Sequence, residues 1–181
     1  MLSKSDVEKG IDGIGNFIRI DKLNRFLKEA QSSDVKRFIL LKLAEAYDSV
    51  NMPEEAAKAF GHAVIASITF RDKIKYCIEE TKMHAKAGNF READESMKKA
   101  FSHANSMQKE EILSEVKKYY MKIGEEYEHA LKRGHAIKIF EHLAGMRLSE
   151  EERYKVKEKL LDLYDKTGNI RKYKMLKGGL D

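Results

Sequence analysis

Cysteine and proline are almost missing from this 181-residue chain, and each scarcity excludes a class of structure. Cys77 is the only cysteine, so an intramolecular disulfide is impossible and a cysteine-based zinc site has no partners. Pro53 is the only proline, which favours long helices over an all-β fold with its many turns. No apolar run approaches the roughly 20 residues that span a bilayer, and residues 1–15 lack the apolar centre of a secretory signal. We therefore expect a cytoplasmic protein that does not associate with membranes.

Neither positive nor negative charge is in large excess. Lys and Arg number 35 against 30 Asp and Glu, a net charge of +5, and no run of five or six basic residues occurs. This excess is too dispersed to indicate a nucleic-acid-binding tail. Apolar residues make up 42% of the chain, which is too many for a disordered protein. The length fits a single domain over residues 1–181 with a real core.

What the chain does contain is helical periodicity. Apolar residues recur at spacings of three and four, as in Phe38, Leu41, Ala44 and Tyr47. Pro53 fits the first turn of a helix. Capping signals are expected at Ser5 with Glu8, at Gly88-Asn89 with Glu92, at Ser149 with Glu152 and at Gly168-Asn169, with a further break at Gly134. These signals predict helices near 3–10, 16–31, 33–50, 54–69, 72–87, 90–105, 108–132, 134–146, 149–167 and 169–177, and no strand.

An internal repeat turns this helical pattern into a more specific prediction. A large residue and a small one, Leu43-Ala44, precede Tyr47, and after a turn come Ala56, Phe60 and Ala63. The rhythm recurs at Gly88, Ala93, Met97 and Ala100, then at Ile123-Gly124, Tyr127, Ala136, Phe140 and Leu143, and in shorter form at Leu160-Leu161, Tyr164, Gly168 and Tyr173. In such a pattern, small residues let the two helices of one repeat approach closely, while the aromatic fills the space between one hairpin and the next.

This pattern resembles the tetratricopeptide repeat over residues 33–177. Residues 123–127 are closest to the first-helix motif of that family, and Ala56, Phe60 and Ala63 are closest to its second-helix motif. The resemblance implies an all-α, right-handed superhelix of about ten antiparallel helices, with repeats at 33–70, 71–107, 108–148 and 149–177 after N-terminal helices at 3–31. Departures exist. Equivalent alanines are 37 and then 43 residues apart instead of 34, and the second copy has Glu80-Thr81 and His84 in place of Leu, a small residue and Tyr. The longer helices are also similar to those of the soluble NSF attachment proteins.

The resemblance implies a groove lined by the first helix of each repeat. Its expected partner-binding residues are Phe38, Leu41, Lys42, Lys75, Ile78, Lys82, Lys118, Met121, Lys122, Lys155 and Lys159. The recurring lysines suggest an acidic peptide as the ligand. Acidic residues share the groove positions, namely Glu45, Glu79, Glu125, Glu158 and Asp162, so the lysines also fit a solvated helix face with Lys/Glu pairs. The apolar members suggest a partner helix, although they also fit ordinary helix packing. A clamp for chaperone tails is excluded, since Glu45 and Glu79 occupy the family's asparagine positions and would repel a carboxylate.

Catalytic and metal-binding motifs are absent from the sequence. Six histidines are scattered without HExxH spacing, and residues 10–15 lack the strand and the lysine of a phosphate-binding loop. The sequence therefore predicts no cofactor, no metal and no enzymatic activity. It favours an adaptor or scaffold that binds a peptide or helix of another protein. The alternative is a nucleic-acid-associated helical repeat that uses its lysines, with affinity that falls steeply as salt rises.

The last predicted hairpin is short. Only residues 177–181 follow Tyr173 and Leu176 in this sequence, and these few residues can cover little of the apolar surface of the two side chains. We expect a second copy of the protein to cover this end, which predicts a homo-oligomer formed through the C-terminal end.

Overall fold

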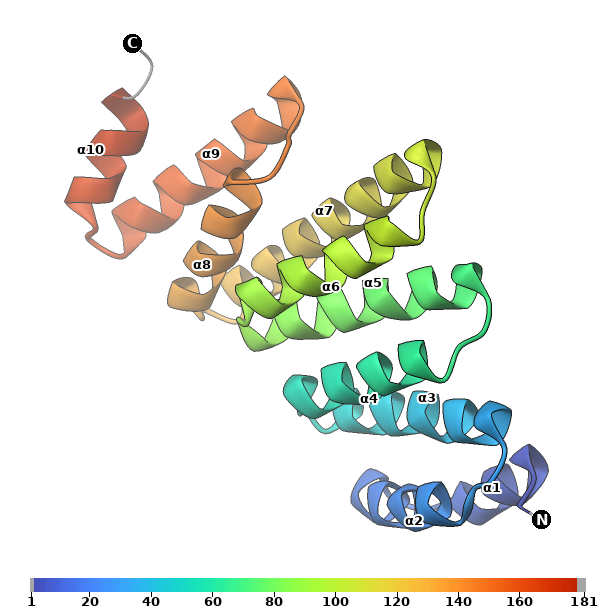
Figure 1. Cartoon of the computed structure of the whole chain (residues 1–181). Coiled ribbons are helices and arrows are strands. Elements are labelled where there is room, and N and C mark those ends of the chain that lie inside the picture. Colours follow the sequence, from blue (N-terminus) through green and yellow to red (C-terminus); the bar gives the residue numbers. More distant parts are fainter. Residues whose placement is uncertain (1, 179–181) are drawn as a thin grey trace. The chain divides into compact units, whose positions relative to one another are not determined.

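The computed structural model of the chain describes residues 2–178, and these residues form ten α-helices and no strand (Figure 1). Their bounds are α1 Lys4–Ile11, α2 Asn16–Glu29, α3 Ser33–Ser49, α4 Pro53–Ile65, α5 Phe70–Ala87, α6 Phe90–Ser102, α7 Ser106–His129, α8 Arg133–Ala144, α9 Glu150–Lys166 and α10 Ile170–Gly178. All ten predicted helices are present, and their ends lie within four residues of the predicted ones.

The helix ends follow local chemistry, with some corrections to the predicted caps. Pro53 is the first residue of α4, and Gly88 ends α5 in the left-handed region with φ of 81°. Asn89 makes no side-chain capping bond, so the predicted capping box at the start of α6 is wrong. The predicted cap at Ser5 is also wrong, because Ser3 and Asp6 form the capping box of α1.

The predicted break at Gly134 lies slightly earlier. Leu131, with φ of 58°, makes the turn before α8, and Gly134 falls inside the first turn of that helix. The sequence placed the break correctly to within a few residues but assigned it to the glycine, the residue that adopts positive φ at least cost.

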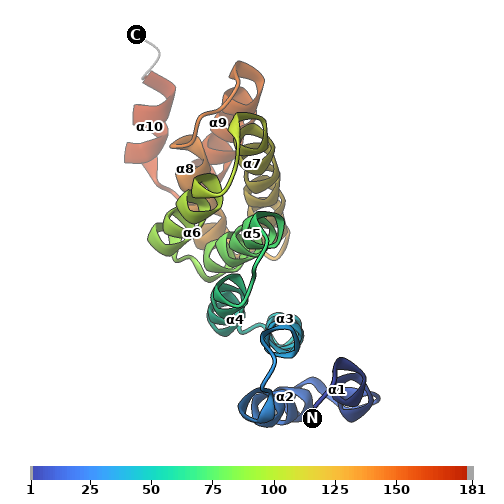
Figure 2. The ribbon, with the colours of Figure 1, turned by 45° about the vertical axis from the view of Figure 1, so that its right-hand side comes forward.

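Two compact units make up the chain, and each is described by itself. The first, Met1–Leu113, contains α1 to α6 and the first turns of α7. Within it each helix from α2 to α6 packs against the next, so that α3 with α4 and α5 with α6 form successive hairpins (Figure 2). The best-buried apolar side chains include Val7, Leu23, Ile39 and Leu43. Burial of these side chains stabilises the contacts among α1, α2 and α3.

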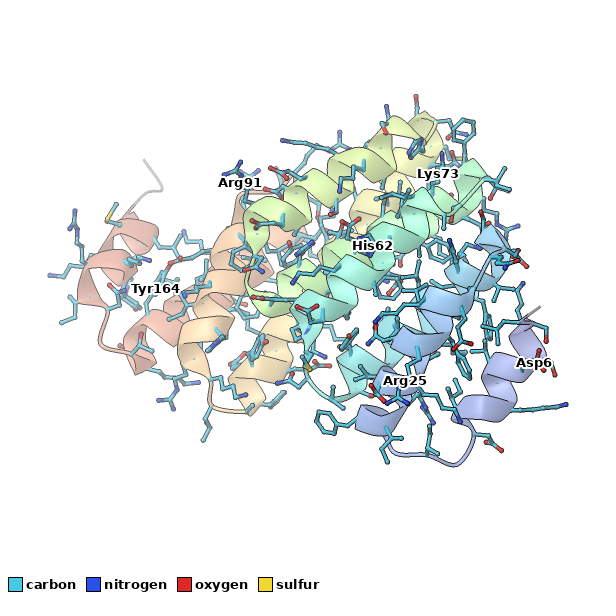
Figure 3. The ribbon with its side chains drawn as sticks, turned by 60° about the horizontal axis from the view of Figure 1, so that its bottom comes forward. Asp6, Arg25, His62, Lys73, Arg91 and Tyr164 are labelled. Atoms are coloured by element: carbon cyan, nitrogen blue, oxygen red, sulfur yellow. The ribbon has the colours of Figure 1, made fainter. Side chains whose placement is uncertain are left out.

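The second unit, Ser114–Asp181, contains the rest of α7 followed by α8, α9 and α10. Tyr164 of α9, labelled in Figure 3, joins three helices of this unit. Its hydroxyl donates a hydrogen bond of 2.6 Å to Glu141 of α8, and Lys172 of α10 donates to the same carboxylate oxygen at 2.6 Å. Burial raises the pKa of Tyr164, and the bond to Glu141 raises it further, so the phenol stays a donor.

The small positions of the repeat are at close helix contacts. Every motif alanine is at most 1% exposed, namely Ala44, Ala56, Ala63, Ala93, Ala100 and Ala136. Gly124 of α7 packs so tightly against Phe140 of α8 that an added Cβ would lie 2.6 Å from the ring. The predicted all-α fold class is confirmed for residues 2–178, and within each unit consecutive helices pack as antiparallel hairpins.

Two further predictions concern the chain as a whole. None of the helices in residues 2–178 is both long enough and apolar enough to cross a membrane. The expected interface at the C-terminal end stays a prediction, and residues 179–181 lie outside the described residues. In the described part of that end, Ile170 and Met175 are exposed, and Tyr173 helps line a hollow of about 380 Å³.

Candidate partner-binding groove

The second unit has an open hollow of about 590 Å³ on one face. It is lined by Met121, Glu125 and Glu128 of α7 and by Lys155, Glu158, Lys159 and Asp162 of α9. We call these seven residues the α7–α9 groove. Three of the eleven predicted partner-binding residues lie in it, namely Met121, Lys155 and Lys159. The structure therefore brings together residues from the third and fourth predicted repeats.

Helical spacing explains why these side chains share one face. On α7 the groove residues are four and then three positions apart, and on α9 they recur at three, one and three, so each helix presents one stripe. The start of α9 is set by a capping box between Ser149 and Glu152. Glu152 also accepts a hydrogen bond of 2.6 Å from Lys117 of α7, and this bond holds the pKa of Glu152 below its usual value. The two stripes are thus held in register at one end.

The charge of the α7–α9 groove is negative. Four carboxylates face two ammonium groups, so the lining carries two net negative charges at neutral pH. The Nζ atom of Lys159 lies 2.9 Å from Glu128 and 3.8 Å from Glu125, so one cation serves both carboxylates. The hydrogen bond to Glu128 raises the pKa of Lys159, which keeps its charge. Lys155 is bound to Glu151 at 2.6 Å, outside the lining.

The remaining predicted residues lie elsewhere. Phe38, Leu41 and Lys42 are on α3, and Lys75, Ile78 and Lys82 are on α5, all in the first unit. Of these, Lys42 and its partner Glu45 help line a separate hollow of about 260 Å³. Ile78 is only 7% exposed, so its side chain packs inside the unit and offers a partner little surface. Lys118 and Lys122 are exposed on α7 but do not line the α7–α9 groove.

Most of the predicted lysines are paired with carboxylates. The pairs are Lys42–Glu45, Lys82–Glu79, Lys122–Glu126, Lys155–Glu151 and Lys159–Glu128. Four of the five join residues three or four positions apart on one helix, which is the arrangement of a solvated helix face. Such pairs contribute little stability each. They also reduce the positive charge that the lysines offer to an acidic peptide.

The first unit contains a buried polar cluster that the sequence did not predict. Glu80 of α5 is 6% exposed, and its Oε1 lies 3.3 Å from Lys99 of α6 and 4.0 Å from Nε2 of His84. Gly61 of α4 makes room for it, since a Cβ there would lie 3.0 Å from Oε1. In the described part of the chain, Glu80 Oε2 and His84 Nδ1 are buried without a hydrogen-bond partner. The sequence signal was the departure of the second copy from the motif at these positions.

Neither a metal-ligating cluster nor an exposed cysteine occurs in residues 2–178. No three or more His, Cys, Asp or Glu side chains gather there in a way that could hold a metal ion. Cys77 is fully buried, and burial raises the pKa of its thiol to about 11. The thiol is therefore protonated at neutral pH, whereas a nucleophilic cysteine needs the thiolate.

Comparisons with known proteins add little to this geometry. The sequence matches no model of a known protein family, and no curated protein matches it. Among solved structures, the chain is similar to one described as the crystal structure of MamA, with 13% sequence identity and a TM-score of 0.45. That similarity covers 97% of this chain and 94% of the other. At this level of identity the likeness does not extend to a shared ligand or partner.

Proposed function

We propose that this chain is a non-enzymatic binding module, an adaptor or scaffold that holds a segment of another protein against its helices. The observation that supports the proposal is the open α7–α9 groove, a hollow of about 590 Å³ lined by residues of two helices. Its lining comes from two helices that the Lys117–Glu152 bond joins at one end of the groove. A groove whose two walls are already in place can receive a short segment without first being assembled.

The alternative of a nucleic-acid-associated protein has less support. A phosphate backbone requires basic side chains that are free to replace counterions. The lysines on the predicted groove positions are mostly engaged with carboxylates, and the α7–α9 groove itself has more acidic than basic side chains. Pairing weakens the attraction of the lysines for phosphates, and the excess of acidic side chains in the groove repels phosphates.

Site-specific cross-linking tests the proposal. A photo-reactive amino acid at Met121, which lies half-buried in the α7–α9 groove, should cross-link the protein to a defined polypeptide in native cell extract. The same amino acid at Lys98, an exposed residue on α6, is the control. The expected result is one product at Met121 that is missing at Lys98 and that disappears when unlabelled protein competes. No product at Met121, or identical products at both positions, would count against a binding role for the groove.

A further inference from the structure

The unbalanced charge of the α7–α9 groove points to the chemistry of its ligand. Glu125 and Glu128 share the single ammonium group of Lys159, at 3.8 and 2.9 Å. On the other side, Asp162 is paired with Lys166 at 2.5 Å, and Glu158 accepts a hydrogen bond from the hydroxyl of Tyr154. A tyrosine hydroxyl leaves the charge of Glu158 in place. The groove therefore retains negative charge on both of its walls.

The floor of the groove is partly apolar. Met121 is half-buried there, and Lys155 and Lys159 line the same hollow. A lysine stem covers apolar surface while its ammonium group reaches solvent or a carboxylate. A ligand that fits such a lining combines a cationic side chain with an apolar one.

We propose that the α7–α9 groove binds a basic segment of a partner protein, in which Lys or Arg side chains alternate with apolar side chains. The inference rests on the proposed binding function and names the chemistry of the partner. Arg suits the site because its planar guanidinium can bind a carboxylate through two parallel hydrogen bonds. The ligand is a peptide cation and not a bare metal ion, since residues 2–178 hold no cluster of ligating side chains that could bind a metal ion.

The overall positive charge of the protein separates specific binding in the groove from non-specific electrostatic binding. The chain carries a net charge of +5, so non-specific electrostatics favour acidic peptides and oppose basic ones. Binding of a basic peptide must therefore come from a locally acidic site. The sequence prediction of an acidic ligand for the groove lysines is the opposite expectation, and one experiment separates the two.

The test uses the full chain and short fluorescent peptides that repeat Arg-Ser-Leu or Glu-Ser-Leu, with binding followed by anisotropy. The Arg peptide should bind more tightly, and its affinity should fall as salt rises because exposed charges are screened. The double variant Glu158→Gln/Asp162→Asn should weaken the Arg peptide about fivefold, which corresponds to about 1 kcal/mol in total, or about 0.5 kcal/mol for each exposed pair. The matched control Glu29→Gln/Glu111→Gln removes two exposed carboxylates outside the groove and should leave affinity within about twofold of wild type.

Circular dichroism confirms that each variant is folded before its affinity is interpreted. A preference for the Glu peptide, or equal weakening by the groove and control variants, would overturn the inference. Cross-linking at Met121 does not depend on the charge of the partner. A product at Met121 together with a preference for the Glu peptide would therefore reject the basic ligand and keep the binding function.

Discussion

Gly124 offers the sharpest test of how the second unit is packed. It lies in the last third of α7, where an added Cβ would meet three ring atoms of Phe140 of α8 at 2.6, 2.7 and 3.1 Å. Non-bonded carbon atoms prefer separations of about 3.5–4.0 Å. Replacing Gly124 with Ala therefore requires the ring, or the whole of α8, to move by about 1 Å. Phe140 is fully buried, so its ring has no solvent to move into.

The free energy of unfolding follows from two opposing effects. Overpacking a well-filled core costs about 1–3 kcal/mol, and three close ring contacts place this case near the upper end. Alanine in place of glycine inside a helix stabilises it by about 1 kcal/mol. We expect Gly124→Ala to destabilise the second unit by about 2 kcal/mol.

Urea unfolding followed by circular dichroism measures the effect. The matched control is Gly134→Ala, because Gly134 is also helical but a Cβ there meets nothing within 4 Å. This control should be stabilising by about 0.5–1 kcal/mol. The double variant Gly124→Ala/Phe140→Leu removes the ring and should recover most of the loss caused by Gly124→Ala, giving a coupling energy of about 1–2 kcal/mol. If Gly124→Ala stabilised the protein as much as Gly134→Ala does, the close packing of α7 on α8 would be refuted.

Two further predictions concern buried titratable groups of the first unit. Because burial raises the pKa of Cys77 to about 11, the native thiol should stay unreactive toward a disulfide reagent at pH about 8 and react fully once the chain is unfolded; rapid native labelling would contradict its burial. Burial also lowers the pKa of His84 below its ordinary value of 6.5, so the imidazole binds a proton more readily in the unfolded chain than in the folded one. The folded state is therefore most favoured above pH 6.5, and this contribution to stability is lost as the pH falls below that value. His84→Gln should therefore reduce the fall in unfolding free energy between pH about 7.5 and about 5.5, and an unchanged pH dependence would show that another group carries it.

The sequence by itself determined the helices and their hairpins. The hydrogen bonds of a helix join residues four positions apart. Residues close in the sequence therefore determine where a helix forms and where it breaks, as at Pro53 and Gly88. The repeat motif also marked Gly124 and Phe140 as a small residue and an aromatic of one repeat, but it expected the aromatic to fill the space between hairpins, whereas the structure packs the Phe140 ring against Gly124 within the α7–α8 hairpin. The misassigned caps at Ser5 and Asn89 show the limit of this reasoning, since neighbouring polar residues compete for the same backbone donors.

Only the tertiary structure decided the chemistry of the surface. The motif placed Lys155, Lys159 and Glu125 at groove positions and suggested an acidic ligand, but it did not place Glu128 there or show that Lys159 meets both glutamates. Lys159 meets Glu128, 31 positions away, through the register of α7 against α9, and no local pattern encodes that register. The burial of Glu80 beside Gly61 of another helix was decided in the same way. Helices form from interactions between residues a few positions apart, whereas the net charge of a groove depends on which helix faces come together when the helices pack.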